Sequence, residues 1–184
     1  MPVFTLSKRH SFPPPHLAIK EGLLAVGGDL TVDRLLTAYR SGIFPWYAEG
    51  DPILWWSPDP RLVLYPHELK ISKSLQRVIK KGVFSITFDQ AFDDVIRGCA
   101  ETKRSYGDGT WITDEMQAAY CRLHRHGYAH SVEAWQADTL VGGLYGVMIG
   151  RAFFGESMFS QVSNSSKVAF VRLVENLRHM DVDL

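Results

Sequence analysis

One carboxylate, that of Glu156, interrupts an apolar stretch over residues 141–160. The stretch has the pattern of two strands joined by a turn at residues 149–151. A lone carboxylate between Phe154 and Met158 is costly to bury unless another group pairs with it or uses it. Two interpretations are open: a strand-end acid that points to water, or an acid beside an apolar pocket that handles an amine or a proton.

The helix predicted over residues 72–81 carries basic residues along one face, at positions i, i+4, i+7 and i+8. They are Lys73, Arg77, Lys80 and Lys81. On a protein whose formal net charge is zero, such a stripe is suited to contact with a phosphate backbone. A solvated helix face has the same pattern, so both interpretations stay open.

Aromatic rings near prolines and in predicted loops form a second candidate surface, because bases and sugars both stack on such rings. The rings are those of Trp46, Tyr47, Trp55, Trp56 and Trp111. Core packing is the alternative for each of them. In an extended backbone, at most one of the adjacent Trp55 and Trp56 rings can face inward.

The sequence lacks the motifs that accompany metal-dependent and nucleophilic catalysis. Cys99 and Cys121 match no metal or redox spacing and are expected to be reduced core residues of a cytosolic protein. His124, His126 and His130 cluster in sequence, but a glycine breaks the predicted helix between them. No HExxH, CxxC, GxSxG, Walker A or Rossmann pattern occurs. We therefore expect no metal and no covalent nucleophile.

Two regions of different composition must position these residues. Residues 1–65 hold most of the prolines and three of the five tryptophans, with one clear helix between Thr31 and Gly42. This predicts a small N-terminal domain over residues 1–65 and a larger domain over residues 66–184. No apolar run is long enough to span a membrane, and the N-terminus has no signal-like core.

The larger region alternates helices and strands, which predicts an α+β fold with a largely antiparallel sheet. After the helix over residues 72–81, the expected elements are a strand over 84–88, a helix capped by Asp89, a polar loop over 102–109, a helix capped by Thr113, strands over 130–136, 140–148 and 151–159, and a helix over 166–179. Residues 180–184 alternate as a strand does at its start, so we expect the sequence to stop inside this domain.

Five short motifs occur in a fixed order and together resemble one family. They are Leu23-Leu-Ala-Val-Gly-Gly-Asp-Leu30, Gly42-Ile-Phe-Pro-Trp46, Leu54-Trp-Trp-Ser-Pro-Asp-Pro-Arg61, Gly109-Thr-Trp-Ile-Thr113 and Gly155-Glu-Ser-Met-Phe-Ser160. The chain closely resembles the bacterial leucyl/phenylalanyl-tRNA–protein transferases. The resemblance implies a cytoplasmic enzyme with a catalytic domain like the acetyltransferase (GNAT) fold, acting in N-degron protein degradation.

The implied reaction moves leucine or phenylalanine, with methionine as a further candidate, from aminoacyl-tRNA to acceptor proteins with N-terminal arginine or lysine. An aminoacyl ester is already activated, so no cofactor is expected; the enzyme must orient an amine and accept its proton. The expected form is a monomer with no membrane partner.

The resemblance also implies roles for single residues. Glu156 would contact the α-amino group of the donor, and a basic helix, here Lys73, Arg77, Lys80 and Lys81, would meet the tRNA stem. The residues expected to bind the aminoacyl group or the terminal adenosine are Leu144 and Phe153 for the side-chain pocket, Trp46 and Trp111 for stacking, and Ser157 and Met158. In the family, an Asp-x-Gln pair on a further strand takes the proton, and this sequence ends at Leu184, about where that strand begins.

Other functions remain open at this point. A GNAT-type acyl-CoA acyltransferase needs a glycine-rich pyrophosphate loop, and the corresponding residues 161–167 contain no glycine, which weighs against CoA. A non-catalytic tRNA- or RNA-binding module is the second alternative, and an aromatic carbohydrate-binding platform is the third.

Overall fold

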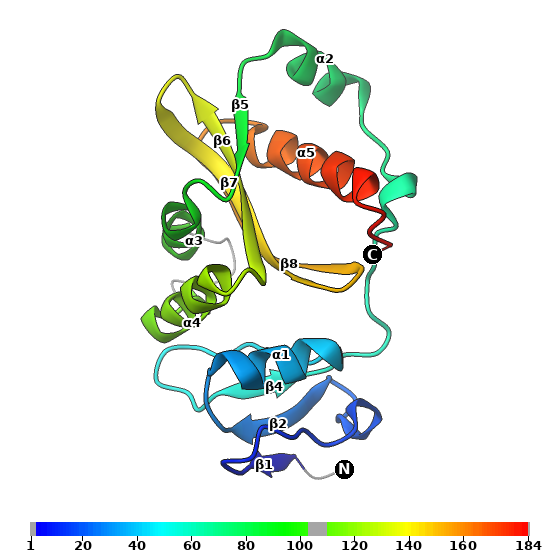
Figure 1. The fold of residues 1–184 in the computed structure, drawn as a ribbon, viewed down its shortest axis with the longest axis vertical. Helices are drawn as coiled ribbons and strands as arrows, with labels where there is room; N and C mark the ends of the chain where they lie inside the picture. Colours follow the sequence, from blue (N-terminus) through cyan, green and yellow to red (C-terminus); the bar gives the residue numbers. More distant parts are fainter. Residues whose placement is uncertain (1–2, 103–109, 184) are drawn as a thin grey trace. The chain divides into compact units, whose positions relative to one another are not determined.

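The computed structural model in Figure 1 describes residues 3–102 and 110–183. Its contacts divide these residues into two compact units. Unit 1 comprises residues 3–62 and 110–119, and unit 2 comprises residues 63–102 and 120–183. The domain boundary after residue 65 stays a prediction. Except for Thr102, the predicted polar loop over residues 102–109 lies outside the described residues.

Unit 1 is built on a four-stranded sheet with the order β1-β2-β4-β3. Its elements are β1 (Phe4–Leu6), η1 (Pro15–Leu17), β2 (Leu23–Gly27), α1 (Val32–Arg40), β3 (Phe44–Pro45) and β4 (Leu54–Trp56). As predicted, Thr31 is the N-cap of α1, although its hydroxyl donates to Asp29 and makes no capping bond. Gly42 follows the helix with a left-handed φ of 71°.

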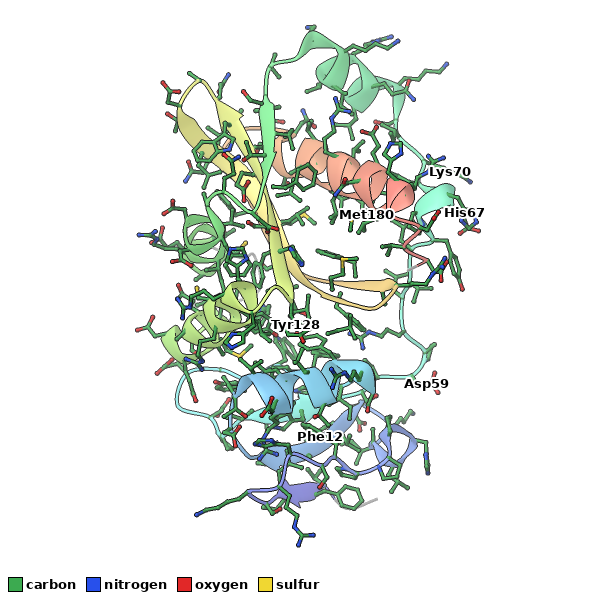
Figure 2. All side chains as sticks on the ribbon, viewed as in Figure 1. Phe12, Asp59, His67, Lys70, Tyr128 and Met180 are labelled. Carbon is green, nitrogen blue, oxygen red and sulfur yellow. The ribbon has the colours of Figure 1, made fainter. Side chains whose placement is uncertain are left out.

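Only one of the two adjacent tryptophans of β4 faces inward, as predicted. Trp55 is fully buried and donates its indole N–H to the Gly27 carbonyl over 2.8 Å. Its ring meets that of Phe12, which is labelled in Figure 2, edge-on at 4.8 Å between centroids. Trp56 is half-buried. The strand alternation therefore assigns Trp55 to the core and leaves Trp56 near the surface.

A buried arginine explains the Gly-Gly-Asp part of the first motif. Arg34 is fully buried and donates to the carbonyls of Ser7 and Arg9 and to the Asp29 carboxylate. A side chain at Gly28, where φ is +85°, would approach the guanidinium to 3.1 Å. Burial alone would raise the pKa of Asp29, but the hydrogen bonds from Arg34 and Thr31 and the charge of Arg34 together outweigh burial and hold that pKa well below its usual range. The motif thus forms an ion pair between the buried Arg34 side chain and the Asp29 carboxylate, which is 42% exposed.

Unit 2 contains an antiparallel sheet with the order β5-β6-β7-β8. Its strands are β5 (Ser85–Phe88), β6 (Ala129–Gln136), β7 (Thr139–Ile149) and β8 (Ala152–Ser160). The helices are η2 (Pro66–Glu68), α2 (Lys73–Lys81), α3 (Phe92–Glu101), α4 (Asp114–Arg125), whose residues from Tyr120 onward belong to this unit, and α5 (Ser165–His179). The α+β class is confirmed, and the predicted strands and last helix begin and end within one residue of these bounds.

Helices cover both faces of this sheet (Figure 1). On one face, α5 contributes to a buried cluster. The members from α5 are Ala169, Leu173 and Leu177, and the others are Val132, Ala134, Leu144 and Val182. On the other face, α3 approaches closely, because a side chain at Gly98 would lie 3.0 Å from the Phe159 ring. Because side chains alternate along β7, Leu144 faces α5 whereas Tyr145 faces α3.

Two predicted local features are wrong. Asp89 does not cap α3, whose N-cap is Ala91. The left-handed φ of 58° at Asp89 directs its carboxylate back to β6, where the Ser131 N–H donates to it over 2.8 Å. Residues 180–181 form a turn, residues 182–183 are not in a strand, and Val182 packs with α5. Within the described ranges, no helix combines the length and apolar character that a membrane crossing requires.

Candidate functional site

Glu156 lies on a β-bulge between β7 and β8. Tyr145 pairs with Ser157 and Gly146 pairs with Gly155, so Glu156 is the extra residue of β8. A bulge turns one side chain away from the regular alternation of its strand. The half-buried Glu156 carboxylate accepts a hydrogen bond from the Tyr120 hydroxyl of α4, with 3.1 Å between the oxygens. The acid is therefore neither free in water nor sealed in the core.

Tyr120 is a functional candidate that the sequence interpretation missed. The residue is fully buried, and its ring meets the Tyr145 ring edge-on, 5.6 Å between centroids. Packing thus fixes the direction of the phenol that contacts Glu156. One signal was present in the sequence: Tyr120 shares the buried face of α4 with Met116 and Leu123, and a buried tyrosine hydroxyl requires a partner.

Three apolar residues predicted for the aminoacyl pocket gather on the α5 face, next to the bulge. Leu144 is 3% exposed within the core cluster, and Phe153 packs against the same cluster. Met158 pairs with Leu144 across the β7–β8 ladder and is 47% exposed. Ser157 instead pairs with Tyr145 and therefore lies on the opposite face. The exposed Met158 is the member of this group that meets solvent most.

The predicted adenosine-stacking rings belong to unit 1. Trp46 is 49% exposed, and its ring lies edge-on to Trp56 at 5.7 Å. The Trp56 indole donates to the Trp46 carbonyl over 2.7 Å. Trp111 is half-buried. Because these rings lie in unit 1 and Glu156 in unit 2, a joint role for them remains a proposal.

A buried phenol lies next to Trp46 in the sequence. Tyr47 is 7% exposed and donates its hydroxyl to the Glu115 carboxylate over 3.1 Å. Burial, followed by the charge of Glu115, raises the pKa of Tyr47 to about 12. The phenol therefore stays protonated at neutral pH and ties the segment after β3 to the first turn of α4.

The predicted basic stripe lies on a well-defined helix. The Ser72 hydroxyl caps α2 by accepting from the Leu75 N–H, and Gly82 ends the helix in a left-handed conformation. All the stripe residues, Lys73, Arg77, Lys80 and Lys81, are exposed. Val78 and Ile79 point the other way, toward a cavity between α2, β5 and α5. The helix thus presents a continuous positive face to solvent.

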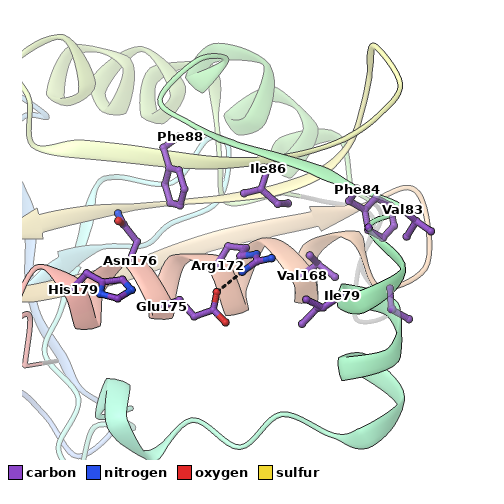
Figure 3. Close-up of a pocket in the computed structure, with 12 residues that line it drawn as sticks. Ile79, Val83, Phe84, Ile86, Phe88, Val168, Arg172, Glu175, Asn176 and His179 are labelled. Atoms are coloured by element: carbon purple, nitrogen blue, oxygen red, sulfur yellow. Dashed lines mark hydrogen bonds and ion pairs between the residues drawn. The ribbon is translucent and has the colours of Figure 1, made fainter.

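The cavity beneath α2 has a volume of about 420 Å³ and is shown in Figure 3. Apolar side chains such as Ile79, Phe84 and Ile86 line one side, and the Arg172–Glu175 ion pair lies on the α5 side. None of the predicted site residues lines this cavity. It is therefore separate from the surroundings of Glu156.

The thiols do not present a nucleophile. Neither cysteine forms a disulfide; Cys99 is buried and Cys121 is half-buried. Burial, followed by a hydrogen bond with Asp93, raises the pKa of Cys121 to about 12, so this thiol is protonated at neutral pH. Among the described residues, no three histidine, cysteine or acidic side chains are grouped so that they could hold a metal.

Two of the three clustered histidines face Asp89, which sequence reasoning did not foresee. His130 Nδ1 donates to Asp89 over 2.7 Å, and His124 Nδ1 lies 3.9 Å from the same carboxylate. The hydrogen bond with Asp89 raises the pKa of His130. Burial alone would raise the pKa of Asp89, but the hydrogen bonds from His130 and Ser131 lower it below its usual range. The cluster is an acid–imidazole pair beside a second imidazole.

Comparison with known proteins identifies the family. A family model described as leucyl/phenylalanyl-tRNA protein transferase matches residues 63–184, and one for the N-terminal domain of that transferase matches residues 28–59. A leucyl/phenylalanyl-tRNA–protein transferase of Syntrophobacter fumaroxidans is 65% identical over 96% of this chain and 76% of the relative. The transferase of Desulforapulum autotrophicum is 57% identical over 100% of this chain and 80% of the relative. The chain belongs to the leucyl/phenylalanyl-tRNA protein transferase family.

Proposed function

We propose that this chain transfers leucine or phenylalanine from aminoacyl-tRNA to the N-terminal arginine or lysine of an acceptor protein. The new peptide bond would mark that protein for N-degron proteolysis. The observation that carries the proposal is the 65% identity to a leucyl/phenylalanyl-tRNA–protein transferase over 96% of the chain. A cytoplasmic location, a monomeric state and a GNAT-like fold for unit 2 are parts of the same proposal.

The reaction requires the protein mainly to position the two substrates and to allow proton transfer. The ester bond to tRNA is already activated, and the incoming α-amine attacks its carbonyl carbon once the amine is neutral. The C–O bond to the ribose breaks as the C–N bond forms, the amine loses a proton, and the ribose oxygen gains one and leaves as a hydroxyl group. Glu156 is suited to hold the donor's own ammonium group, because it is half-exposed and fixed by the Tyr120 hydroxyl.

Apolar side chains on the α5 face, next to the bulge that carries Glu156, would select the donor. Leu144, Phe153 and Met158 lie together on the α5 face, where an alkyl or aromatic side chain can be buried. Apolar surroundings of this kind reject polar residues strongly but separate leucine, phenylalanine and methionine by only about 1–3 kcal/mol. Methionine is therefore a third candidate donor. Ser157, on the opposite face, would contact the donor through its backbone or hydroxyl.

The tRNA would be bound through charge and stacking. The exposed cations of α2 are placed for the phosphates of the tRNA stem, and the exposed ring of Trp46 offers a stacking surface for the terminal adenosine. Trp111 is proposed as the second ring of that adenosine site. These contacts carry no base-specific hydrogen bonds, so donor choice would rest mainly on the aminoacyl group.

The proposal is tested by mixing the protein with tRNA charged with radiolabelled leucine and a peptide that begins with arginine. Label should enter the peptide, and a matched peptide that begins with alanine should remain unlabelled. Absence of transfer, together with retained tRNA binding in a filter assay, would support the non-catalytic RNA-binding module instead.

The tRNA surface is tested by reversing charge at Lys80 and Lys81 to glutamate. Binding should weaken, and the plot of log K against log salt should become less steep, its slope decreasing in magnitude by about 2, because two phosphate contacts are lost. The control reverses Lys8 and Lys20, which are exposed in unit 1 and match the change in net charge. An unchanged slope in the α2 variant, or an equal change in the control, removes α2 from the tRNA surface.

A further inference from the structure

A continuous series of contacting rings in unit 2 ends at Glu156. The rings of His124 and Phe92 are stacked, with centroids 4.3 Å apart and planes within 5° of parallel. Phe92 meets Tyr145 edge-on at 5.8 Å, and Tyr145 meets Tyr120 edge-on at 5.6 Å. The Tyr120 hydroxyl then donates to the Glu156 carboxylate. We call His124, Phe92, Tyr145 and Tyr120 the ring series.

The outer end of the ring series is held from two sides. His124 Nδ1 lies 2.8 Å from the Ala129 carbonyl, which can only accept, so this nitrogen carries the proton. The Asp89 carboxylate lies 3.9 Å from the same nitrogen and is itself bound by His130. The imidazole is therefore fixed in its plane while one face is stacked on Phe92.

The middle of the ring series is tightly packed. Phe92 is 3% exposed, and Tyr120 and Tyr145 are fully buried. In an interior of this density, a displaced ring forces its neighbour to move. His124 also lies one helical turn after Tyr120 on α4, on the same face of that helix. Two physical routes, the rings and the helix, thus connect His124 with the phenol that contacts Glu156.

We propose that His124 is a positioning residue for Glu156. Its ring holds Phe92 and Tyr145 in place and thereby aims the Tyr120 hydroxyl at the carboxylate. Without that ring, Phe92 gains a void on one face, Tyr145 and Tyr120 relax toward it, and the carboxylate loses its fixed donor. This inference rests on the proposed transfer reaction, in which Glu156 orients the aminoacyl donor.

The kinetic test removes or keeps the ring. His124→Ala should lower kcat for leucine transfer by about tenfold while KM for Leu-tRNA changes by less than about twofold. His124→Phe, which keeps a stacking ring, should restore kcat to within about threefold of wild type. In a Glu156→Gln background, His124→Ala should lower kcat by less than about twofold, because both substitutions act through the same carboxylate. An undiminished tenfold loss in that background overturns the inference.

A second measurement reads the geometry without activity. A 3-fluorotyrosine at position 120 should give a ¹⁹F resonance that moves by more than its line width in His124→Ala and stays in place in His124→Phe. His126→Ala, at an exposed histidine two residues further along, is the control and should leave the resonance unmoved. An unmoved resonance in His124→Ala overturns the positioning role even if the enzyme is active. A moved resonance in a protein that transfers nothing contradicts the proposed function instead.

Discussion

Glu133 and Glu156 are carboxylates on the same sheet with opposite surroundings. Glu133 lies in the regular strand β6, is fully buried, and accepts hydrogen bonds from the hydroxyls of Ser131 and Thr87. Glu156 lies on a bulge of β8, is half-buried, and accepts from Tyr120. Each acid has hydroxyl partners, but only the second can be reached by a substrate.

The difference shows that burial of an acid is not by itself a sign of function. Both oxygens of Glu133 are used inside the fold, and the network continues outward from Thr87 to the Trp135 indole over 2.8 Å. A satisfied network of this kind makes the strand pairing specific. At the bulge, the Tyr120 hydroxyl contacts Glu156, and part of the Glu156 surface stays open. We therefore propose that Glu133 serves the fold and that Glu156 serves the site.

The largest effect should come from truncating the buried acid. Glu133→Ala leaves the hydroxyls of the buried Ser131 and the half-buried Thr87 without their acceptor and creates a cavity, which should lower the free energy of unfolding by about 3 kcal/mol. The matched variant Glu156→Ala should lower it by less than about 1 kcal/mol, since its site is open to water. Urea denaturation of both variants measures the difference. Equal losses would remove the structural distinction between the two acids.

Removing one hydroxyl group that donates to each carboxylate sharpens the contrast. Tyr120→Phe takes the donor from Glu156 and should slow transfer by about tenfold, or about 1.4 kcal/mol of barrier. Thr87→Val takes a donor from Glu133 and should lower the unfolding free energy by about 1 kcal/mol, with transfer per folded molecule unchanged. Single-turnover rates and urea midpoints, measured on both proteins, separate the outcomes. Slower transfer in Thr87→Val would tie Glu133 to the reaction.

The smallest effect concerns Asp89, a carboxylate whose side chain is 37% exposed. Its pKa is lowered from 3.8 in the folded state, so its stabilisation is lost as pH falls through the folded value. The pKa of His130 is raised from 6.5, so its stabilisation is present below 6.5 and is lost as pH rises through the folded value. The pair should therefore stabilise the fold most between these limits.

The corresponding variant is His130→Gln. Its deficit in unfolding free energy should be greatest near about pH 5.5 and smaller at about pH 8, and should stay below about 1 kcal/mol because the pair is partly exposed. Urea unfolding at both pH values gives the measurement. A deficit that grows above pH 7 would show that the pair is not the source of stabilisation.

Sequence reasoning succeeded where the signal is local. Ser72 and Gly82 bound α2 as predicted, and the Thr113 hydroxyl accepts from the Met116 N–H at the start of α4. Caps and turns depend on a few adjacent residues, so their positions can be read from one segment. The turn at residues 149–151 was found for the same reason.

Sequence reasoning failed where partners come from distant segments. Asp89 has the residue type of an N-cap, but donors on β6 bind its carboxylate. The bulge at Glu156 is a property of two strands in register, and no single strand reveals it. The contact from Tyr120 spans 36 residues of sequence, and the burial of Glu133 depends on Thr87, 46 residues earlier. Such pairings appear only when the sheet and its helices are assembled.

The most direct test compares Glu156→Gln with Glu133→Gln in one transfer assay, with rates expressed per folded molecule. Each change keeps the size of the side chain and removes its charge. We expect Glu156→Gln to transfer leucine about 100-fold more slowly than wild type, about 2.7 kcal/mol of barrier, and Glu133→Gln to remain within about threefold. A Glu156→Gln rate within about threefold of wild type would contradict the role given to this acid.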